Sequence, residues 1–320
     1  MDELKTILEY LMTPSTPIFL VGGLIVLIVP LLVHFFIVQQ TPYTNLPSII
    51  LAGPPGAGKT ALLTLLERGG LPDEHGNVGK EMAAATHTSQ APHAVELTVS
   101  TDGKAASFRE AAREDAPGKH RKFLLVDTPG HGKLRAQALS HLLPDGGGSS
   151  HISGISEKPQ NRLRGVVFVV DAAALEDASN TTTNGNGSLA DAAGYLYEVL
   201  LALQRRTGAG RTSKTPNAVA VLVAANKADL FTALPASLVK SRLEAELGRI
   251  RASRSKGLLD SGVGGDDVGS EELDVWLGRY GTEAFAFDQM REFDLEVEVV
   301  GGSVREGSVD KWWDWISSRI

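Results

Sequence analysis

The sequence contains no cysteine among its 320 residues. This absence excludes disulfide-stapled folds, zinc sites built from thiolates and catalysis by a thiol nucleophile. Basic charge is scarce as well, because 31 Lys and Arg residues stand against 38 Asp and Glu residues and are scattered along the chain. A chain without a clustered basic surface gives no electrostatic reason to expect binding of DNA or RNA. Its length is sufficient for one substantial hydrophobic core.

Charged residues are missing altogether from residues 18–38, and this run is strongly apolar. At about 1.5 Å per helical residue the run spans roughly 32 Å, close to the hydrocarbon thickness of a bilayer. We therefore expect a transmembrane helix over residues 18–38, followed by a polar linker over residues 39–47. A cleaved signal peptide and a buried core helix are the alternatives. The acidic residues Asp2, Glu3 and Glu9 disfavour a signal peptide, which begins with basic residues.

The stretch LAGPPGAGKT contains a complete phosphate-loop motif, G-x-x-x-x-G-K-[ST], between an apolar strand and a leucine-rich helix. Its glycines allow successive backbone N–H groups to curl around a phosphate at the positive end of the helix. Lys59 offers a cation to the β and γ phosphates of a nucleotide, and the Thr60 hydroxyl is an oxygen ligand suited to Mg²⁺. An ordinary surface loop is the alternative, which the flanking strand and helix disfavour. The residues predicted to bind the phosphates are Gly53, Pro54, Pro55, Gly56, Ala57, Gly58, Lys59, Thr60 and Ala61.

A second stretch, KFLLVDTPGHGKLR, holds an apolar strand that ends in the pattern D-x-x-G. The Asp127 carboxylate at the end of this strand can hold Mg²⁺ through water. The Gly130 N–H can bond to a γ phosphate and be released when that phosphate leaves. The same pattern also occurs in plain turns. Its position after a strand, downstream of the phosphate loop, favours a nucleotide site.

A third stretch, AVAVLVAANKADL, ends in Asn226-Lys227-x-Asp229 and predicts which base the site takes. A carboxylate at Asp229 can accept hydrogen bonds from N1–H and the exocyclic amine of guanine, which adenine cannot donate. A later strand is followed by Ser303-Val304-Arg305, which resembles the S-A-K loop whose backbone supports the base in GTPases, although Val304 and Arg305 depart from that pattern. The residues that we predict to contact the nucleotide here are Asn226, Lys227, Asp229, Ser303 and Val304.

The predicted elements alternate along the chain. A strand, a loop and a helix are followed by a long polar region, two strands, and then helices and strands in alternation. This order predicts an α/β fold with a mostly parallel six-stranded sheet and helices on both faces. We therefore expect a Ras-like P-loop G domain over residues 48–320. Two segments rich in Gly, Ser and charge, residues 144–161 and 252–272, are expected to form flexible loops because they can bury little apolar surface.

The segments GPPGAGKT, DTPGHGKLR, NKADL and FAFDQM, together with the apolar run, give the chain a specific resemblance. It resembles the β-subunit family of the signal recognition particle receptor, a group of Arf/Sar-like small GTPases with a membrane anchor. The resemblance implies binding of GTP, GDP and Mg²⁺, a short lumenal tail over residues 1–17, a single span in the endoplasmic reticulum membrane and a cytosolic G domain. It also implies that the GTP-bound form recruits the receptor α subunit, with the translocon and the ribosome–nascent chain complex as further neighbours.

Two further residues are candidates for a switch and for catalysis. The stretch THTSQAP resembles the switch I loop of this family, in which a hydroxyl reaches Mg²⁺, so we predict Thr88 as that ligand and Thr86 as the alternative. His131 stands where Ras-type enzymes carry glutamine and can orient the attacking water, or it can be idle. The resemblance implies slow or partner-dependent GTP hydrolysis by the isolated chain.

Two other functions remain compatible with these motifs. One is a different membrane-tethered Arf/Sar-like GTPase. The other is a membrane-bound P-loop enzyme, such as a kinase or a transport ATPase, that uses the nucleotide for chemistry. An enzyme of that kind needs a second substrate site or catalytic motif, which the sequence does not display, and N-K-x-D disfavours ATP.

Overall fold

The computed structural model of the protein describes a short part of the N-terminal region and most of the chain beyond it. The described residues are 23–24, 26–32, 46–68, 85–100, 120–142, 163–175, 189–208, 219–260, 276–278 and 284–320. The chain divides into two compact units, Met1–Thr44 and Asn45–Ile320.

The first unit contains the residues predicted to span a membrane. Residues 26–32 are helical, and their apolar side chains are exposed, Val26 to 74% and Leu27 to 64%. No helix in the described part of the chain has both the length and the apolar run that a membrane span needs. The predicted tail over residues 1–17, both ends of the predicted span and most of the linker lie outside the described residues, as does the insert predicted over residues 144–161.

The second unit is built on a six-stranded sheet. Its strands are β1 (Ser48–Ala52), β2 (His93–Ser100), β3 (His120–Asp127), β4 (Leu163–Asp171), β5 (Val219–Asn226) and β6 (Leu295–Gly301). Their order across the sheet is β2-β3-β1-β4-β5-β6. β2 runs antiparallel to β3, and the other neighbouring pairs are parallel. The prediction of a mostly parallel six-stranded sheet of the Ras-like kind is therefore confirmed.

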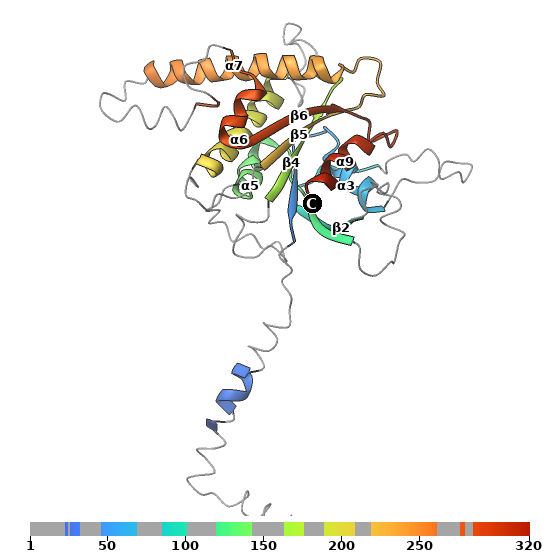
Figure 1. The fold of residues 1–320 in the computed structure, drawn as a ribbon, viewed down its shortest axis with the longest axis vertical. Coiled ribbons are helices and arrows are strands. Elements are labelled where there is room, and N and C mark those ends of the chain that lie inside the picture. The colour runs from blue at the N-terminus through green and yellow to red at the C-terminus, as the bar shows by residue number, and fades with distance from the viewer. Residues whose placement is uncertain are drawn as a thin grey trace, which may run out of the picture. The chain divides into compact units, whose positions relative to one another are not determined.

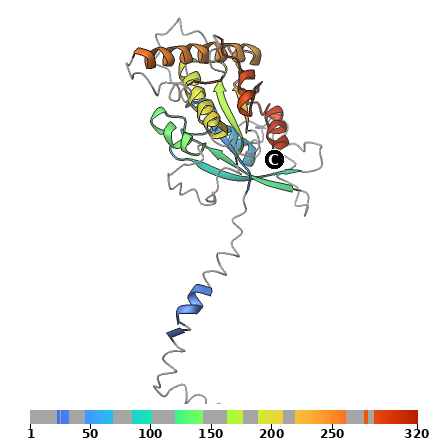
Figure 2. The ribbon, with the colours of Figure 1, turned by 60° about the vertical axis from the view of Figure 1, so that its left-hand side comes forward.

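Helices cover both faces of this sheet, as Figures 1 and 2 show. They are α3 (Lys59–Arg68), α5 (Arg135–Ser140), α6 (Leu189–Gly208), α7 (Ala236–Asp260) and α9 (Asp310–Ser318), with the short 3-10 helices η1 (Gly132–Leu134) and η4 (Phe287–Phe293). Side chains of α5, α6, α7 and η4 form one hydrophobic cluster with the strands. Side chains of α3 and α9 form a second cluster on the opposite face. The sheet therefore lies between two layers of helices.

The residue pattern of each strand matches its place in the sheet. β5 lies between β4 and β6, and all 8 of its residues are buried, in agreement with the continuous apolar run VAVLVAA. β2 lies at the edge and alternates, since Leu97 and Val99 are buried while Glu96 is exposed. A strand covered by helices on both faces needs apolar side chains in both directions, whereas an edge strand needs them on one side.

The insert predicted over residues 252–272 begins later than expected, because α7 continues to Asp260. Ala, Arg, Lys and Leu in this part of the sequence have high helix propensity and outweigh its Ser and Gly content. Tertiary packing supports the same turn, since the Arg254 guanidinium lies 4.4 Å from the centre of the Tyr197 ring on α6. The expectation of a loop over residues 252–260 is therefore wrong, and the remainder of the insert lies outside the described residues.

The parallel strands bring their carboxyl ends to one edge of the sheet. β3 ends at Asp127, β4 at Asp171 and β5 at Asn226. In the sheet register Asp127 lies beside Leu51 of β1, and Asp171 lies beside Asn226. The polar residues that end these apolar strands therefore gather at one edge, where the candidate site is built.

α9 closes the second hydrophobic cluster with its tryptophans. Trp312 is 1% exposed, and its indole N–H donates to the Val300 carbonyl at 3.1 Å. Gly302 makes room for the ring, because a Cβ atom there would lie 2.8 Å from Trp312 Cζ2. Trp315 and Ile316 are buried in the same cluster. The prediction that these side chains of the terminal helix pack in the core is confirmed.

Replacing Trp312 by alanine is expected to lower the free energy of unfolding by about 3–5 kcal/mol, because it removes a fully buried ring and its hydrogen bond. Chemical denaturation of the detergent-solubilised chain, followed by circular dichroism, measures the change. The exposed neighbour Lys311 provides the control, since Lys311→Ala should stay within about 0.5 kcal/mol of the original protein. A Trp312→Ala protein as stable as the control would contradict this description of the core.

Candidate functional site

The phosphate loop joins β1 to α3 and depends on glycine at three positions. Gly53, Gly56 and Gly58 have φ angles of 138°, 74° and 102°, which side chains rarely permit. A Cβ atom would also collide at Gly53, 2.2 Å from the Val169 carbonyl oxygen, and at Gly58, 2.3 Å from Asn226 Nδ2. At Gly53 and Gly58 both the backbone angle and the available space therefore require glycine, whereas at Gly56 the backbone angle alone does.

The remaining residues of the loop differ in exposure. Gly56 forms its exposed crest, whereas Pro54 and Ala57 are buried, and Pro55, Thr60 and Ala61 are half-buried. Ala61 packs against the hydrophobic cluster beneath α3. The residues predicted to bind phosphate thus form one continuous turn whose apolar side chains anchor it to the core.

Lys59 is the first residue of α3 and lies under this turn. Its ammonium donates to the carbonyl oxygens of Gly53 and Pro54, both at 2.8 Å, and the residue is only 5% exposed. Burial lowers the pKa of Lys59 to about 8, an effect that the Asp127 carboxylate opposes and the Arg135 guanidinium reinforces. An anionic phosphate beside the ammonium would favour its charged form, so the environment of Lys59 suits a phosphate ligand.

Asp127 ends β3 and is 1% exposed. Its Oδ2 accepts a hydrogen bond from Thr60 Oγ1 at 2.6 Å, whereas its Oδ1 is buried without a hydrogen-bond partner among the described residues. Burial raises the pKa of Asp127, although the bond from Thr60 and the nearby Lys59 and His93 lower it. Mg²⁺ prefers hydroxyl, carboxylate and water oxygens, and a cation would satisfy the unpaired oxygen. Thr60 and Asp127 therefore fit a magnesium site.

Gly130 packs directly onto the phosphate loop. A Cβ atom at this position would lie 2.5 Å from Lys59 Nζ and 2.6 Å from the Gly53 carbonyl oxygen. The approach is fixed from behind by Thr128, which is fully buried and donates from Oγ1 to the Leu51 carbonyl at 2.7 Å. The peptide predicted to sense a γ phosphate therefore lies beside the predicted phosphate-binding ammonium.

His131 follows Gly130, and its side chain forms a hydrogen bond within the next turn of the chain. The residue is exposed, and its Nδ1 accepts the Lys133 N–H at 3.3 Å, so that it caps η1. In this conformation the imidazole stabilises the start of η1. His131 is therefore adjacent to Gly130 in sequence, while its side chain forms the hydrogen bond that caps η1.

Thr86 and Thr88, the residues predicted for switch I, lie in the segment that precedes β2. Thr86 and Thr88 are exposed in an irregular segment that leads into this strand. β2 begins at His93, which pairs with Asp127 in the antiparallel register. The segment therefore enters the sheet level with the residue predicted to hold Mg²⁺, a short chain length from Thr88.

The Asn226 side chain joins three segments of the site. Its Nδ2 donates to the Ala57 carbonyl of the phosphate loop at 2.7 Å. Its Oδ1 accepts the Lys227 N–H at 2.7 Å and the Val304 N–H at 3.0 Å. Asn226 is 3% exposed and Val304 is 3% exposed, so these bonds are shielded from water. The loops that follow β1, β5 and β6 are thereby held in fixed relative positions.

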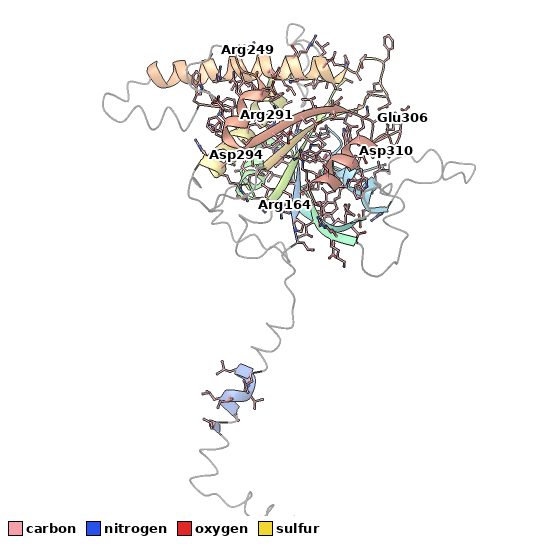
Figure 3. All side chains as sticks on the ribbon, viewed as in Figure 1. Arg164, Arg249, Arg291, Asp294, Glu306 and Asp310 are labelled. Carbon is pink, nitrogen blue, oxygen red and sulfur yellow. The ribbon has the colours of Figure 1, made fainter. Side chains whose placement is uncertain are left out.

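Asp229 is oriented from the loop after β6. The Ser303 hydroxyl donates to Asp229 Oδ1 at 2.6 Å, and Ser303 Oγ in turn accepts the Glu306 N–H at 3.2 Å. Figure 3 labels Glu306 and, close to it, Asp310 at the start of α9. The carboxylate predicted to recognise guanine therefore has one oxygen engaged by a side chain whose own position is fixed.

Sequence analysis assigned no role to one residue at this edge, Asp171. Its carboxylate accepts a hydrogen bond from the Lys227 ammonium and caps the Ala173 N–H at 3.0 Å. The sequence does contain a pattern that could have indicated a role for Asp171. It is an acidic residue at the end of an apolar strand, LRGVVFVVD, and the same pattern identified Asp127. It was missed because D-A-A carries no recognised motif.

The edge of the sheet at the carboxyl ends of the parallel strands therefore carries several groups suited to binding a nucleotide. Curled backbone amides and a buried ammonium can hold phosphates, a hydroxyl and carboxylate can hold Mg²⁺, and a second carboxylate can accept hydrogen bonds from a base. The polar groups are fixed by bonds to one another, so the site is largely formed in advance of binding.

Comparison with known proteins gives a consistent result. Residues 44–293 match the family described as the signal recognition particle receptor beta subunit. Signal recognition particle receptor subunit beta of Saccharomyces cerevisiae is 28% identical over 287 residues, which cover 88% of this chain and 87% of the yeast protein.

Two solved structures from Chaetomium thermophilum are also similar. The signal recognition particle receptor SRb-GTP/SRX complex has 42% sequence identity and a TM-score of 0.66, and the match covers 86% of this chain and 100% of that chain. The SRb-GDP-Mg structure has 39% identity and a TM-score of 0.57, with 88% and 100% covered.

The affinity for a nucleoside triphosphate is expected to fall as the pH is raised. The free protein holds Lys59 with a pKa of about 8, and bound phosphates require its protonated form, so binding above that pH must take up a proton. The affinity at about pH 9 should therefore be about tenfold lower than at about pH 7. Titration of the detergent-solubilised chain with a fluorescent nucleotide measures this dependence.

The control for this effect is Lys59→Arg, whose side chain keeps its proton over the whole range. Its affinity can be weaker overall but should not change across the same pH interval. An original protein whose affinity stays constant over these two pH units would contradict the role given to Lys59.

Proposed function

Because the chain belongs to the family of the signal recognition particle receptor beta subunit, we propose that it is the membrane-anchored, GTP-binding subunit of such a receptor. In its GTP-bound state it recruits the receptor α subunit to the endoplasmic reticulum membrane for co-translational protein targeting. The observation that carries this proposal is the set of bonds from Asn226, which ties the predicted base-reading loop to the predicted phosphate loop.

Selection of guanine rests on Asp229. One of its oxygens is engaged by Ser303, and the carboxylate remains half-exposed at the mouth of the site. A carboxylate held in this way accepts from N1–H and the 2-amino group of guanine, whereas adenine presents no matching donors. Val304 and Lys227 complete the base pocket, with the Val304 backbone supporting the base. ATP is consequently a poor ligand, which disfavours a P-loop kinase or transport ATPase.

In this proposal Thr60 would hold Mg²⁺ directly and Asp127 would hold it through water, and the cation would neutralise negative charge on the phosphates of a bound triphosphate. Thr88 reaches the same cation from the segment before β2. Support comes from the unpaired Asp127 Oδ1 and from the relative solved with GDP and Mg. The Gly130 backbone N–H contacts the γ phosphate in this proposal, which the close packing of Gly130 on Lys59 and the phosphate loop supports, and this segment and the Thr88 segment respond to the nucleotide state.

In this proposal, nucleotide binding at the site controls whether the chain binds its partner at a membrane. Residues 18–38 carry no fixed charge, and the described helical part, residues 26–32, exposes its apolar side chains. We propose a single span there, with residues 1–17 in the lumen and the G domain in the cytosol, where GTP is available. The related SRb-GTP/SRX complex supports the α subunit as the partner. The translocon and the ribosome–nascent chain complex are the further neighbours.

Hydrolysis of GTP is slow in the isolated chain. His131 is the residue able to orient the attacking water, but its Nδ1 is engaged in capping η1. A general base must come within hydrogen-bond reach of the water that it activates. Docking of the partner or a change in this turn is therefore needed before His131 takes part.

Replacing Asp229 by asparagine is expected to exchange the base preference of the site. The amide still accepts from Ser303, but it offers a donor where guanine offers its own amino group, whereas xanthine has a carbonyl there. Affinity for GTP should fall about tenfold to a hundredfold, since hydrogen bonds to a charged group contribute about 1.5–3 kcal/mol. Affinity for xanthosine triphosphate should rise, as competition binding with GTP, XTP and ATP measures.

Asp314→Asn is the matched control, because it makes the same change of charge on the exposed side of α9. It should leave all three affinities unchanged. A preference for ATP over GTP in the original protein, or guanine selectivity that survives Asp229→Asn, would contradict guanine recognition by this carboxylate.

Recruitment is tested by capture of the purified receptor α subunit on the full-length chain in detergent. The chain loaded with a non-hydrolysable GTP analogue should retain the α subunit, and the chain loaded with GDP should not, because only the γ phosphate fixes the segments around Gly130 and Thr88. Asp229→Asn should show the same behaviour when it is loaded with the xanthosine analogue. Equal retention with the two nucleotides would overturn the switch proposal.

A further inference from the structure

Asp171 ends β4, the strand between those that lead into the predicted phosphate loop and the predicted base-reading loop. β4, which it ends, is placed between β1, which leads into the phosphate loop, and β5, which leads into Asn226 and Asp229. A nucleotide with its phosphates on the loop and its base at Asp229 therefore passes over the end of β4.

The Asp171 carboxylate is held in place by the backbone that follows it. Its Oδ1 accepts the N–H groups of Ala173 at 3.0 Å and Ala174 at 3.3 Å, so the side chain closes a short turn after β4. Its Oδ2 accepts the hydrogen bond from the Lys227 ammonium. One oxygen thus binds the backbone of the local turn, and the other binds the lysine that follows β5. The Asp171 side chain is only 17% exposed.

Lys227 is fixed at both ends. Its φ angle of 66° lies in the left-handed region, which is uncommon for a residue other than glycine, asparagine or aspartate. This backbone conformation is stabilised by the bond from the Lys227 N–H to Asn226 Oδ1. Because the ammonium is bound at Asp171, the four-carbon stem extends from the end of β5 toward the end of β4.

We propose that Asp171 is a positioning residue for guanine-nucleotide binding, which acts by holding the Lys227 ammonium so that the lysine stem forms an apolar support beneath the sugar and the purine ring. This inference rests on the proposed function. The carboxylate also neutralises the ammonium, so that Lys227 presents its hydrocarbon stem to the base. Support of one face of the ring slows release of the nucleotide without adding a hydrogen bond to it.

The test uses Asp171→Asn in the full-length chain in detergent. Asparagine keeps an oxygen that accepts from Ala173 and Ala174, but it removes the charge that holds the ammonium. Dissociation of fluorescent GDP should become about tenfold faster, as expected for loss of one charge-assisted contact. Asp314→Asn is the control for the change of charge and should leave the dissociation rate unchanged.

A double-mutant cycle separates positioning from a structural role. Lys227→Met keeps an unbranched side chain without an ammonium, so it should speed dissociation by a similar factor. Asp171→Asn added to Lys227→Met should then have no further effect, because Asp171 acts only through the ammonium. A second increase of the same size in the methionine background would mean that Asp171 supports the turn alone, and it would overturn the proposal.

The remaining outcomes are also decisive. An Asp171→Asn protein that binds GDP with the original dissociation rate overturns the inference while the proposed function stands. An original protein without affinity for guanine nucleotides overturns both. If Asp171→Asn does not fold, as judged by its circular dichroism, Lys227→Met tests the same contact from the other side, and an unchanged dissociation rate in that variant overturns the inference.

Discussion

The amide of Asn226 is the constraint on which the geometry of the site depends. Its nitrogen donates to the phosphate loop, while its oxygen accepts from its own loop and from the loop after β6. Three loops from three different strands thus meet at one buried side chain. A buried amide is stable only when its donors and acceptors are paired, so a shift of any one loop leaves polar groups without partners. The predicted phosphate loop and the predicted base-reading loop are therefore held in fixed relative positions by this one side chain.

Two buried residues of opposite charge lie at the predicted phosphate-binding end of the site. Lys59 and Asp127 are both buried, and burial lowers the pKa of the lysine and raises that of the aspartate. Each group partly compensates the other, and Thr60 donates to the carboxylate. One Asp127 oxygen nevertheless remains without a hydrogen bond in the described structure. A phosphate beside Lys59 and a divalent cation beside Asp127 would favour the charged form of each residue. The electrostatics of the pocket are thus matched to a nucleotide with its metal.

The two helical layers keep these groups in place. Gly165 of β4 allows the Trp315 ring to approach the sheet, since a Cβ atom there would lie 2.9 Å from the ring. On the other face, the ring of Tyr195 in α6 meets Phe168 edge to face at 5.5 Å and lies 4.7 Å from the Arg135 guanidinium. Arg135 also bonds to Asp191 at 2.6 Å. The helix α5, which follows Gly130, His131 and η1, is consequently fastened to the core by its first residue, Arg135.

Local signals in the sequence were sufficient for much of this description. Runs such as VAVLVAA and the glycines of the phosphate loop are dictated by burial and by backbone angles that few residues adopt, so strand order along the chain, the parallel sheet and the loop were predictable. The helical path of residues 252–260 was not, because contacts such as Arg254 on Tyr197 come from distant segments.

The sequence by itself determined the motifs that predict the chemistry of Lys59, Thr60, Asp127 and Asp229, since the spacing of each motif is local. Only the tertiary structure decided their partners. The bond from Ser303 to Asp229, the contact of Asn226 with Ala57 and the pairing of Lys227 with Asp171 join residues far apart in the sequence. Such contacts depend on the register between strands, which periodicity within a single strand does not specify.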